Sequence, residues 1–194
     1  MKITPVHLDF DILAGDDRPR GKGVHASDLY NSLFHRMQPQ RYTNEDMCRP
    51  LVAMGLGWEW QVERALRACG IPWQRPPEYC TTEGIYFNPD GLTQVEGVDA
   101  VGEIKLTRMS ARAMLGDPRF DKWMTQVKCY CHHLEIPRAV FISGHMNGSY
   151  PRKGEDRSLG DPSLKVNMVE FSAAELQEEW DMLLAHGRRE GLIS

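Results

Sequence analysis

The sequence predicts an α/β protein in which a mixed β-sheet is flanked by helices. The chain has 194 residues, of which 41% are hydrophobic and 26% charged, so it can bury a sizeable core and has the composition of a globular protein. Between about residues 51 and 145 the spacing of apolar residues changes from that of a helix to that of strands and back, in the order α-βββ-α-β. Because no repeat, low-complexity tract or linker interrupts the chain, residues 1–194 are expected to form a single domain.

Before this core, the sequence predicts one helix, which begins at Ser27. Ser27 can cap the helix and Asp28 suits its first turn, while Pro39 ends it. One apolar stripe follows helical spacing and consists of Leu29, Tyr30, Leu33, Phe34 and Met37. Further upstream, Val6–Leu13 alternates in the manner of a strand.

The core begins with a helix over Ala53–Cys69, which Gly70-Ile71-Pro72 stops. Its apolar positions recur at helical spacing and are Trp58, Val62, Ala65, Leu66 and Cys69. The following stretch, Glu78–Thr107, predicts three short strands. Turn signals separate these strands and stand at Glu83-Gly84, Pro89-Asp90-Gly91 and Glu96-Gly97.

The remaining elements are a helix, two strands and a final helix. The helix covers Asp121–Leu134, and the strand after it covers Arg138–Ser143. Leu164–Phe171 alternates as a second strand. The pattern Ser172-Ala-Ala-Glu175 is a capping box, which opens the last helix at Ala173–His186.

Two carboxylates and a lysine are placed to meet at the last of the three strands. Side chains two residues apart on a strand point to the same face, so Glu103 and Lys105 project together while Ile104 points into a core. Asp90 lies in a Pro-Asp-Gly turn, which can end one strand and present a carboxylate at its edge. Such carboxylates can hold Mg²⁺, which polarises a phosphate and lowers the pKa of a bound water, and the lysine can orient that water. The pattern therefore favours hydrolysis of phosphodiester bonds.

These residues resemble the motif of the PD-(D/E)XK nuclease superfamily, which reads here as Pro89-Asp90 followed by Glu103-Ile104-Lys105. The resemblance implies a restriction-endonuclease-like core and a metal-dependent deoxyribonuclease. It implies that Asp90, Glu103 and the backbone carbonyl of Ile104 hold Mg²⁺ or Mn²⁺. Lys105 would position or activate the water, and a glutamate from the preceding helix would complete the metal ligands.

Two glutamates can supply that last ligand, and spacing alone does not separate them. Glu59 and Glu63 are four residues apart and therefore share one side of the helix. Glu59 is favoured because it follows Gly57-Trp58, as the glutamate of the family tends to follow a glycine, and a glycine there lets the helix approach the sheet closely. Glu63 has an adequate role of its own in a surface ion pair with Arg67.

The helix after the Glu-x-Lys strand resembles that of the RecB-like and phage-type exonuclease branch. Gln126 and Tyr130 fall on one helical face, as the glutamine and tyrosine of that branch do, and would support the site. This resemblance implies an exonuclease that acts on DNA in recombination, replication or repair. A structure-specific endonuclease on the same core and a non-catalytic nucleic-acid-binding protein are the alternatives. As further partners, the resemblance leaves open a single-strand annealing or recombination protein and other copies of the chain.

Composition also sets the expected surroundings of the protein. A net charge of −4 argues against a protein that coats nucleic acid non-specifically. Five scattered cysteines fit reduced thiols, and we expect neither a membrane span nor a secretory signal, so the predicted location is the cytosol. The resemblance to the phage-type exonuclease branch implies that this is the cytosol of a bacterium or of a phage-infected host. Some members of the superfamily bind an iron–sulfur cluster through one early cysteine and three late ones. No cysteine follows Cys131 here, so no cluster is expected.

Overall fold

The computed structural model describes residues 21–37, 49–112, 117–147 and 162–194. The helices are α2 (Ala26–Met37), α3 (Arg49–Ala68), α4 (Pro118–Leu134) and α5 (Ala173–Arg189). The strands are β1 (Val24–His25), β2 (Trp73–Gln74), β3 (Tyr79–Cys80), β4 (Ile85–Phe87), β5 (Gly91–Val95), β6 (Val98–Thr107), β7 (Arg138–His145) and β8 (Ser163–Glu170). Among the described residues, no helix is long and apolar enough to cross a membrane.

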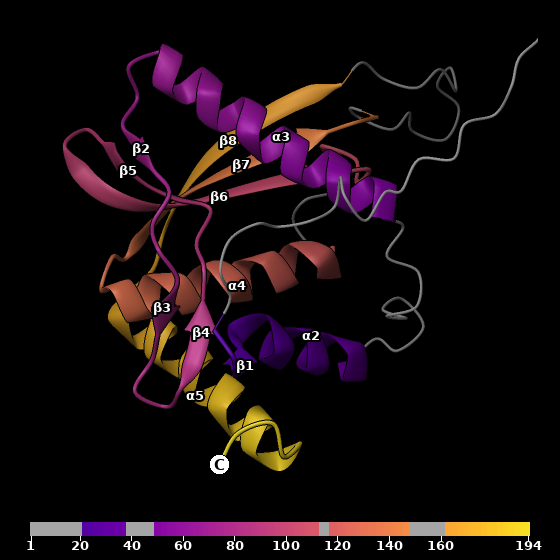
Figure 1. Ribbon diagram of the computed structural model, residues 1–194, viewed down its shortest axis with the longest axis vertical. Coiled ribbons are helices and arrows are strands. Elements are labelled where there is room, and N and C mark those ends of the chain that lie inside the picture. The colour runs from indigo at the N-terminus through magenta and orange to yellow at the C-terminus, as the bar shows by residue number, and fades with distance from the viewer. Residues whose placement is uncertain (1–20, 38–48, 113–116, 148–161) are drawn as a thin grey trace, which may run out of the picture.

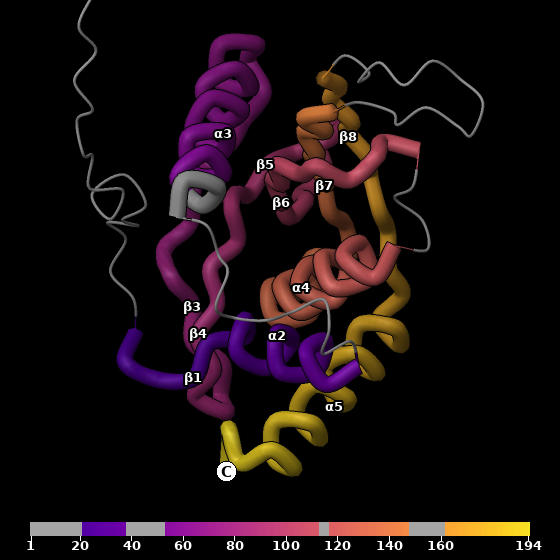
Figure 2. The backbone as a smooth tube through the Cα atoms, turned by 90° about the vertical axis from the view of Figure 1, so that its right-hand side faces the viewer, coloured from indigo at the N-terminus to yellow at the C-terminus, as the bar shows by residue number. Residues whose placement is uncertain are grey.

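The described strands form two sheets, and helices cover both faces of the larger one. The larger sheet has the order β2-β5-β6-β7-β8 and the smaller one the order β1-β4-β3. β6 and β7 are parallel, and the other neighbours in the larger sheet are antiparallel. α3 packs on one face of the larger sheet, while α4 packs on the other with α2 and α5 behind it (Figures 1 and 2). The predicted fold class, a mixed sheet flanked by helices, is confirmed.

Helices are present at all four places where the spacing of apolar residues predicts them. The cap predicted for the first one is wrong. α2 begins one residue before Ser27, and the backbone N–H of His25 donates to Oδ2 of Asp28 at 2.8 Å. Asp28 thus reaches back to the start of the helix, as the third residue of a capping box does. The capping box predicted for the last helix is present. The strand expected at Val6–Leu13 lies outside the described residues.

The number of strands predicted between Glu78 and Thr107 is wrong. Four strands form there, because each of the three turn signals separates two strands. Only β5 and β6 belong to the larger sheet, whereas β3 and β4 join β1 in the smaller one. The third strand of the predicted βββ unit is β2, which pairs antiparallel with β5. Along the larger sheet, α3, β2, β5, β6, α4 and β7 still follow the predicted order α-βββ-α-β.

The hairpin of β5 and β6 decides which backbone groups of β6 turn toward the end of β5. Its turn is Glu96-Gly97, and both residues have positive φ, 54° and 77°, as a two-residue hairpin loop requires. In such a hairpin the pair next to the turn exchanges hydrogen bonds, and so does every second pair after it, up to Gly91 and Gly102. Ile104 is next in this series. Its N–H and C=O therefore point to the side of β6 where β5 has already ended.

Trp73 closes this hairpin on the side of α3. A Cβ added at Gly91 would lie 2.2 Å from Cε2 of the indole, and one added at Gly102 would lie 2.1 Å from its Cη2. The ring is buried in a cluster with Val62 and Ile104. Both glycines are therefore required by the close approach of the indole.

Replacing one of these glycines tests the packing. Gly102→Ala should lower the free energy of unfolding by about 1–3 kcal/mol, because the new methyl group overlaps the Trp73 ring. Gly55→Ala is the control. Outside the backbone of α3, no atom of the described residues lies within 4 Å of a Cβ there, and the change replaces a glycine inside α3, so stability should rise by about 0.5–1 kcal/mol. Denaturant unfolding measures both, and a Gly102→Ala protein as stable as the wild type would contradict this packing.

Candidate active site

Asp90 is fixed to β6 at the point where β5 begins. Its side chain is buried, and its Oδ2 accepts a hydrogen bond from the backbone N–H of Ile104 at 2.8 Å. The carboxylate thus takes the place that the next residue of β5 would occupy in the ladder. The carbonyl of Ile104 points to the same side as its N–H, because both groups of one strand residue face the same neighbour.

Glu103 and Lys105 leave β6 on the face that α2 and α4 cover. They alternate with Ile104 and share the face of Val101, which belongs to the core on that side. Glu103 is 0% exposed, and its Oε1 is ion-paired with Nζ of Lys105. Its Oε2 has no hydrogen-bond partner among the described residues. A buried carboxylate oxygen in this state is costly unless a proton or a cation compensates it.

The local charges change the pKa of both side chains. Burial and the Asp90 carboxylate raise the pKa of Glu103 to about 8, although Lys105 acts in the opposite direction. Burial alone would lower the pKa of Lys105, but the charges of Glu103 and Asp90 outweigh it, so that pKa lies above its usual value. Lys105 is therefore a cation at neutral pH, whereas Glu103 keeps its proton there until a higher pH or a bound cation removes it.

These residues fit a Mg²⁺ ion that takes few ligands from the protein. Asp90 and Glu103 offer carboxylate oxygens, and Ile104 offers its carbonyl on the same side. Mg²⁺ is commonly held by one or two carboxylates and takes water or phosphate oxygens for the rest. In the part of the chain that the structure describes, no three Asp, Glu, His or Cys side chains are grouped to hold a metal. The set in place is therefore two carboxylates and one carbonyl.

Glu63 is engaged in ion pairs on both of its oxygens. Oε1 lies 2.5 Å from Nη2 of Arg67, and Oε2 lies 3.1 Å from Nη2 of Arg75. The pair with Arg67 was predicted, but Glu63 is buried and does not lie on a solvated edge. These contacts give it a structural role between α3 and the segment after β2.

The charge of Glu59 acts on the carboxyl group of Glu103. Oε2 of Glu59 is 3.9 Å from Nη2 of Arg75, and the charge of this carboxylate contributes to the raised pKa of Glu103. One reason for preferring Glu59 is wrong, however. Among the described residues, and apart from the backbone of α3 itself, a Cβ at Gly57 would meet no atom within 4 Å, so this glycine is not needed for a close approach of α3 to the sheet. Its assignment as a metal ligand stays a prediction.

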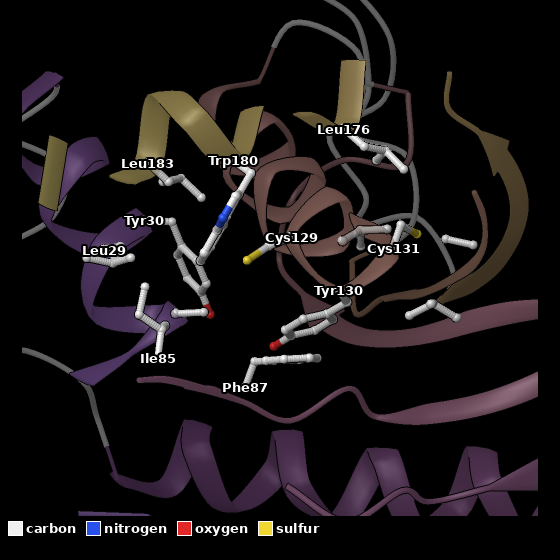
Figure 3. Close-up of a cluster of buried hydrophobic side chains, with 14 of the residues drawn as sticks. Leu29, Tyr30, Ile85, Phe87, Cys129, Tyr130, Cys131, Leu176, Trp180 and Leu183 are labelled. Carbon is white, nitrogen blue, oxygen red and sulfur yellow. The ribbon is translucent and has the colours of Figure 1, made fainter. Parts of the chain in front are cut away.

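The predicted pair on α4 lies beside Asp90. Nε2 of Gln126 donates to the hydroxyl of Tyr130 at 2.8 Å, and both side chains are buried. Together with Asp90 they line a cavity of about 190 Å³, which the first turn of α2 and Asn88 also border. Figure 3 shows the Tyr130 ring next to Phe87, with its hydroxyl on the side of Tyr30. The shared helical face that the spacing predicts is therefore present.

Two residues that the sequence analysis missed lie near the same site. Tyr30 was assigned to an apolar stripe, but it lines the cavity. Burial raises the pKa of its hydroxyl, and the charges of Lys105 and Glu103 also act on that pKa. Nζ of Lys122 lies 5.9 Å from the centroid of the Tyr30 ring. Burial and the charge of Lys105 lower the pKa of Lys122. Spacing in the sequence could have indicated Lys122, because it precedes Gln126 by four residues and so lies in the same row of side chains on α4.

Comparisons with known proteins give similarities of fold at low identity. No family model matches the sequence, and no curated protein matches it. The alkaline exonuclease LHK-Exo from Laribacter hongkongensis is 17% identical, with a TM-score of 0.49 over 87% of this chain and 89% of that one. The structure of LHK-Exo in complex with dAMP is 18% identical in sequence, with a TM-score of 0.48 over the same shares of the two chains. SSO0001 is 12% identical in sequence, with a TM-score of 0.46 over 87% of this chain and 78% of its own.

The raised pKa of Glu103 predicts how Mg²⁺ binding depends on pH. A carboxylate binds a cation in its deprotonated form, so binding must displace a proton below about pH 8. Affinity should therefore rise roughly tenfold per pH unit up to about pH 8 and level off above it. Calorimetric titration in two buffers of different ionisation enthalpy measures both the affinity and the released proton. Glu103→Gln should remove the pH dependence, and an affinity that is independent of pH in the wild type would contradict the prediction.

Proposed function

We propose that this chain is a metal-dependent nuclease that hydrolyses phosphodiester bonds of DNA, and that it works as an exonuclease. The observation that carries the proposal is the junction of Asp90, Ile104 and Glu103, where two buried carboxylates and a carbonyl meet beside Lys105. A folded core gains no stability from burying two carboxyl groups beside each other, because burial and the Asp90 charge make it costly to ionise Glu103. Such an arrangement is typical of sites that bind a cation and its anionic substrate.

The role of each residue follows from its contacts. A Mg²⁺ ion held here would neutralise charge on the phosphate and lower the pKa of a water molecule. The N–H of Ile104 holds Asp90 through Oδ2, which leaves Oδ1 to bind the cation. Lys105 stays protonated because its pKa is raised, so it acts by orienting water or stabilising charge on the phosphate, and not as a general base.

The pair on α4 supports a role in holding the substrate. Tyr130 stays neutral because burial raises its pKa well above the usual value. Since Gln126 donates to the oxygen of this hydroxyl, the O–H of Tyr130 can donate to another acceptor, such as a phosphate or sugar oxygen. The cavity of about 190 Å³ is smaller than a typical ligand pocket, which begins at about 300 Å³. It has room for part of one nucleotide, and the exonuclease assignment rests on the resemblance of Gln126 and Tyr130 to the exonuclease branch.

Digestion of end-labelled linear DNA and of relaxed, covalently closed circles tests the activity and its class. With Mg²⁺, linear DNA should be degraded progressively to short products while the circles survive, and EDTA should stop the reaction. Efficient linearisation of the circles would indicate an endonuclease. DNA binding without cleavage in Mg²⁺ or Mn²⁺ would overturn the nuclease assignment.

Substitution of the three central residues tests the mechanism. Asp90→Asn, Glu103→Gln and Lys105→Ala should each lower the cleavage rate by about 10²-fold or more, because each removes a charge that acts on the phosphate or the cation. Asp99→Asn is the control, since Asp99 lies at the far end of the same hairpin, where its Oδ1 accepts a hydrogen bond from Nε2 of Gln94. Circular dichroism shows whether each variant is folded. A Lys105→Ala protein of wild-type activity would rule out this mechanism.

The two helix glutamates can be separated by one matched pair of variants. Glu59→Gln should raise the Mg²⁺ concentration for half-maximal cleavage by about 10–100-fold, as loss of a group that tunes a metal site does. Glu63→Gln should leave the Mg²⁺ dependence unchanged and lower stability by roughly 1–3 kcal/mol, because Arg67 and Arg75 lose their buried partner. Cleavage rates over a Mg²⁺ series and thermal unfolding measure these effects. The reverse pattern would assign the ligand to Glu63.

A further inference from the structure

The free edge of the larger sheet carries a row of exposed apolar side chains. β8 is the outer strand of this sheet, and no described residue pairs with its outer side (Figure 1). Leu164, Val166 and Met168 are 56%, 59% and 49% exposed. Natural edge strands commonly carry charged residues or proline, which prevent pairing with another chain. β8 does contain Lys165, but its side chain lies on the opposite face of the strand, so this apolar row itself carries no charge.

The same three residues turn their backbone groups toward the free edge. Just beyond β8, the N–H of Phe171 donates to the carbonyl of Pro137 at 2.9 Å, so this pair is a hydrogen-bonded one. Such pairs recur at every second residue of an antiparallel ladder. The odd-numbered residues of β8 therefore bond to β7, and the even-numbered ones present N–H and C=O groups outward. Exposed backbone and exposed apolar side chains thus coincide at the same positions.

α3 extends this apolar surface over the sheet. A groove of about 240 Å³ runs between α3 and β8 and is lined by Trp58, Ala65 and Leu66 on one side and by Leu164 and Val166 on the other. A surface with an apolar floor and a border of backbone donors and acceptors suits an added β-strand better than a helix or a small molecule, because only a strand satisfies both.

We propose that this strand is β8 of a second copy of the chain, paired antiparallel about a two-fold axis at Val166. In this register Val166 stands opposite itself, and Leu164 stands opposite residue 168 of the other copy. The outward N–H and C=O groups of Leu164, Val166 and Met168 then all pair, and both apolar rows are covered. A shift of two residues in one direction would place Leu164 opposite the charged residue 170, and a shift in the other would place Met168 opposite the proline at position 162.

The charges on β8 agree with this register. Lys165 and Glu170 are its charged residues. Lys165 stands opposite Asn167 of the other copy, and Glu170 stands opposite Pro162, so no like charges face each other. Because the axis is normal to the sheet, both copies of α3 lie on the same face, and the two apolar rows form one floor between them.

The size of the contact sets its expected strength. Eight residues at about 3.4 Å each make a seam about 27 Å long. Eight strand residues a side, with the flank of α3 added, are fewer than the about 20–30 residues a side of a standard stable interface. The dimer should therefore form reversibly at micromolar concentrations. An isologous contact of this kind closes at two copies and does not build longer assemblies.

Sedimentation velocity of the full chain over about 1–100 μM tests the proposal, a range that brackets a micromolar dissociation constant. The wild type should pass from monomer to dimer. Val166→Asp places two carboxylates opposite each other and should raise the dissociation constant at least about tenfold. Asn167→Asp carries the same added charge but faces Lys165 of the other copy, so its dimer should be as strong as that of the wild type or stronger. A monomeric wild type throughout, a trimer, or an unchanged Val166→Asp dimer would overturn the proposal.

A cysteine test fixes the register and does not depend on the folding of the Val166→Asp variant. Opposed residues of a hydrogen-bonded pair have Cα atoms about 5.5 Å apart, within the reach of a disulfide. In a background where Cys48, Cys69 and Cys80 are serine, Val166→Cys should oxidise to a covalent dimer. Leu164→Cys should not, since the two copies of position 164 lie four residues out of register. Equal cross-linking of both variants, or of neither, would overturn the proposed pairing.

Discussion

The hydrogen bond from the N–H of Ile104 to Oδ2 of Asp90 is the contact on which the candidate site depends. It stands where the ladder between β5 and β6 ends, while β6 continues beside β7 as far as Thr107. One side of β6 is thereby left open to groups from both faces of the sheet. α3 brings Glu59 from one face, and α2 and α4 bring Tyr30 and the glutamine–tyrosine pair from the other. The sheet thus supplies a fixed edge, and the helices determine what surrounds it.

The central residues could be predicted because local spacing decides which side chains share a face. A separation of two on a strand places Glu103 and Lys105 together, and a separation of four on a helix does the same for Gln126 and Tyr130. Asp90 followed from the chemistry of a Pro-Asp-Gly turn. The long helices followed from apolar periodicity. Each of these inferences uses only residues that are close in the sequence.

The features that could not be predicted depend on contacts between distant segments. β2 is a strand of two residues, which is too short to show any periodicity, and it is recognised only by its pairing with β5. Arg75 approaches both helix glutamates from beyond the end of α3. Tyr30 has the same place in an apolar stripe whether its hydroxyl meets the core or a cavity. The predicted closeness of α3 at Gly57 was wrong because α3 approaches the sheet through the side chain of Trp58, whose ring would meet a Cβ at Gly144 at 2.6 Å, and not through its own glycine.

The hairpin also determines when the two carboxylates come together as the chain folds. Asp90 and Ile104 are only 14 residues apart, and a two-residue turn joins their strands, so the loss of chain entropy on closing this loop is small. Hairpins of this kind form within about 1–10 μs. The pairing of β6 with β7 must instead wait for α4, which connects them. We therefore expect the acidic pair to assemble early, while water still surrounds it, and to lose that water only when α2 and α4 dock. The electrostatic cost of burial thus falls on the last stage of folding, where a proton or a bound cation can reduce it.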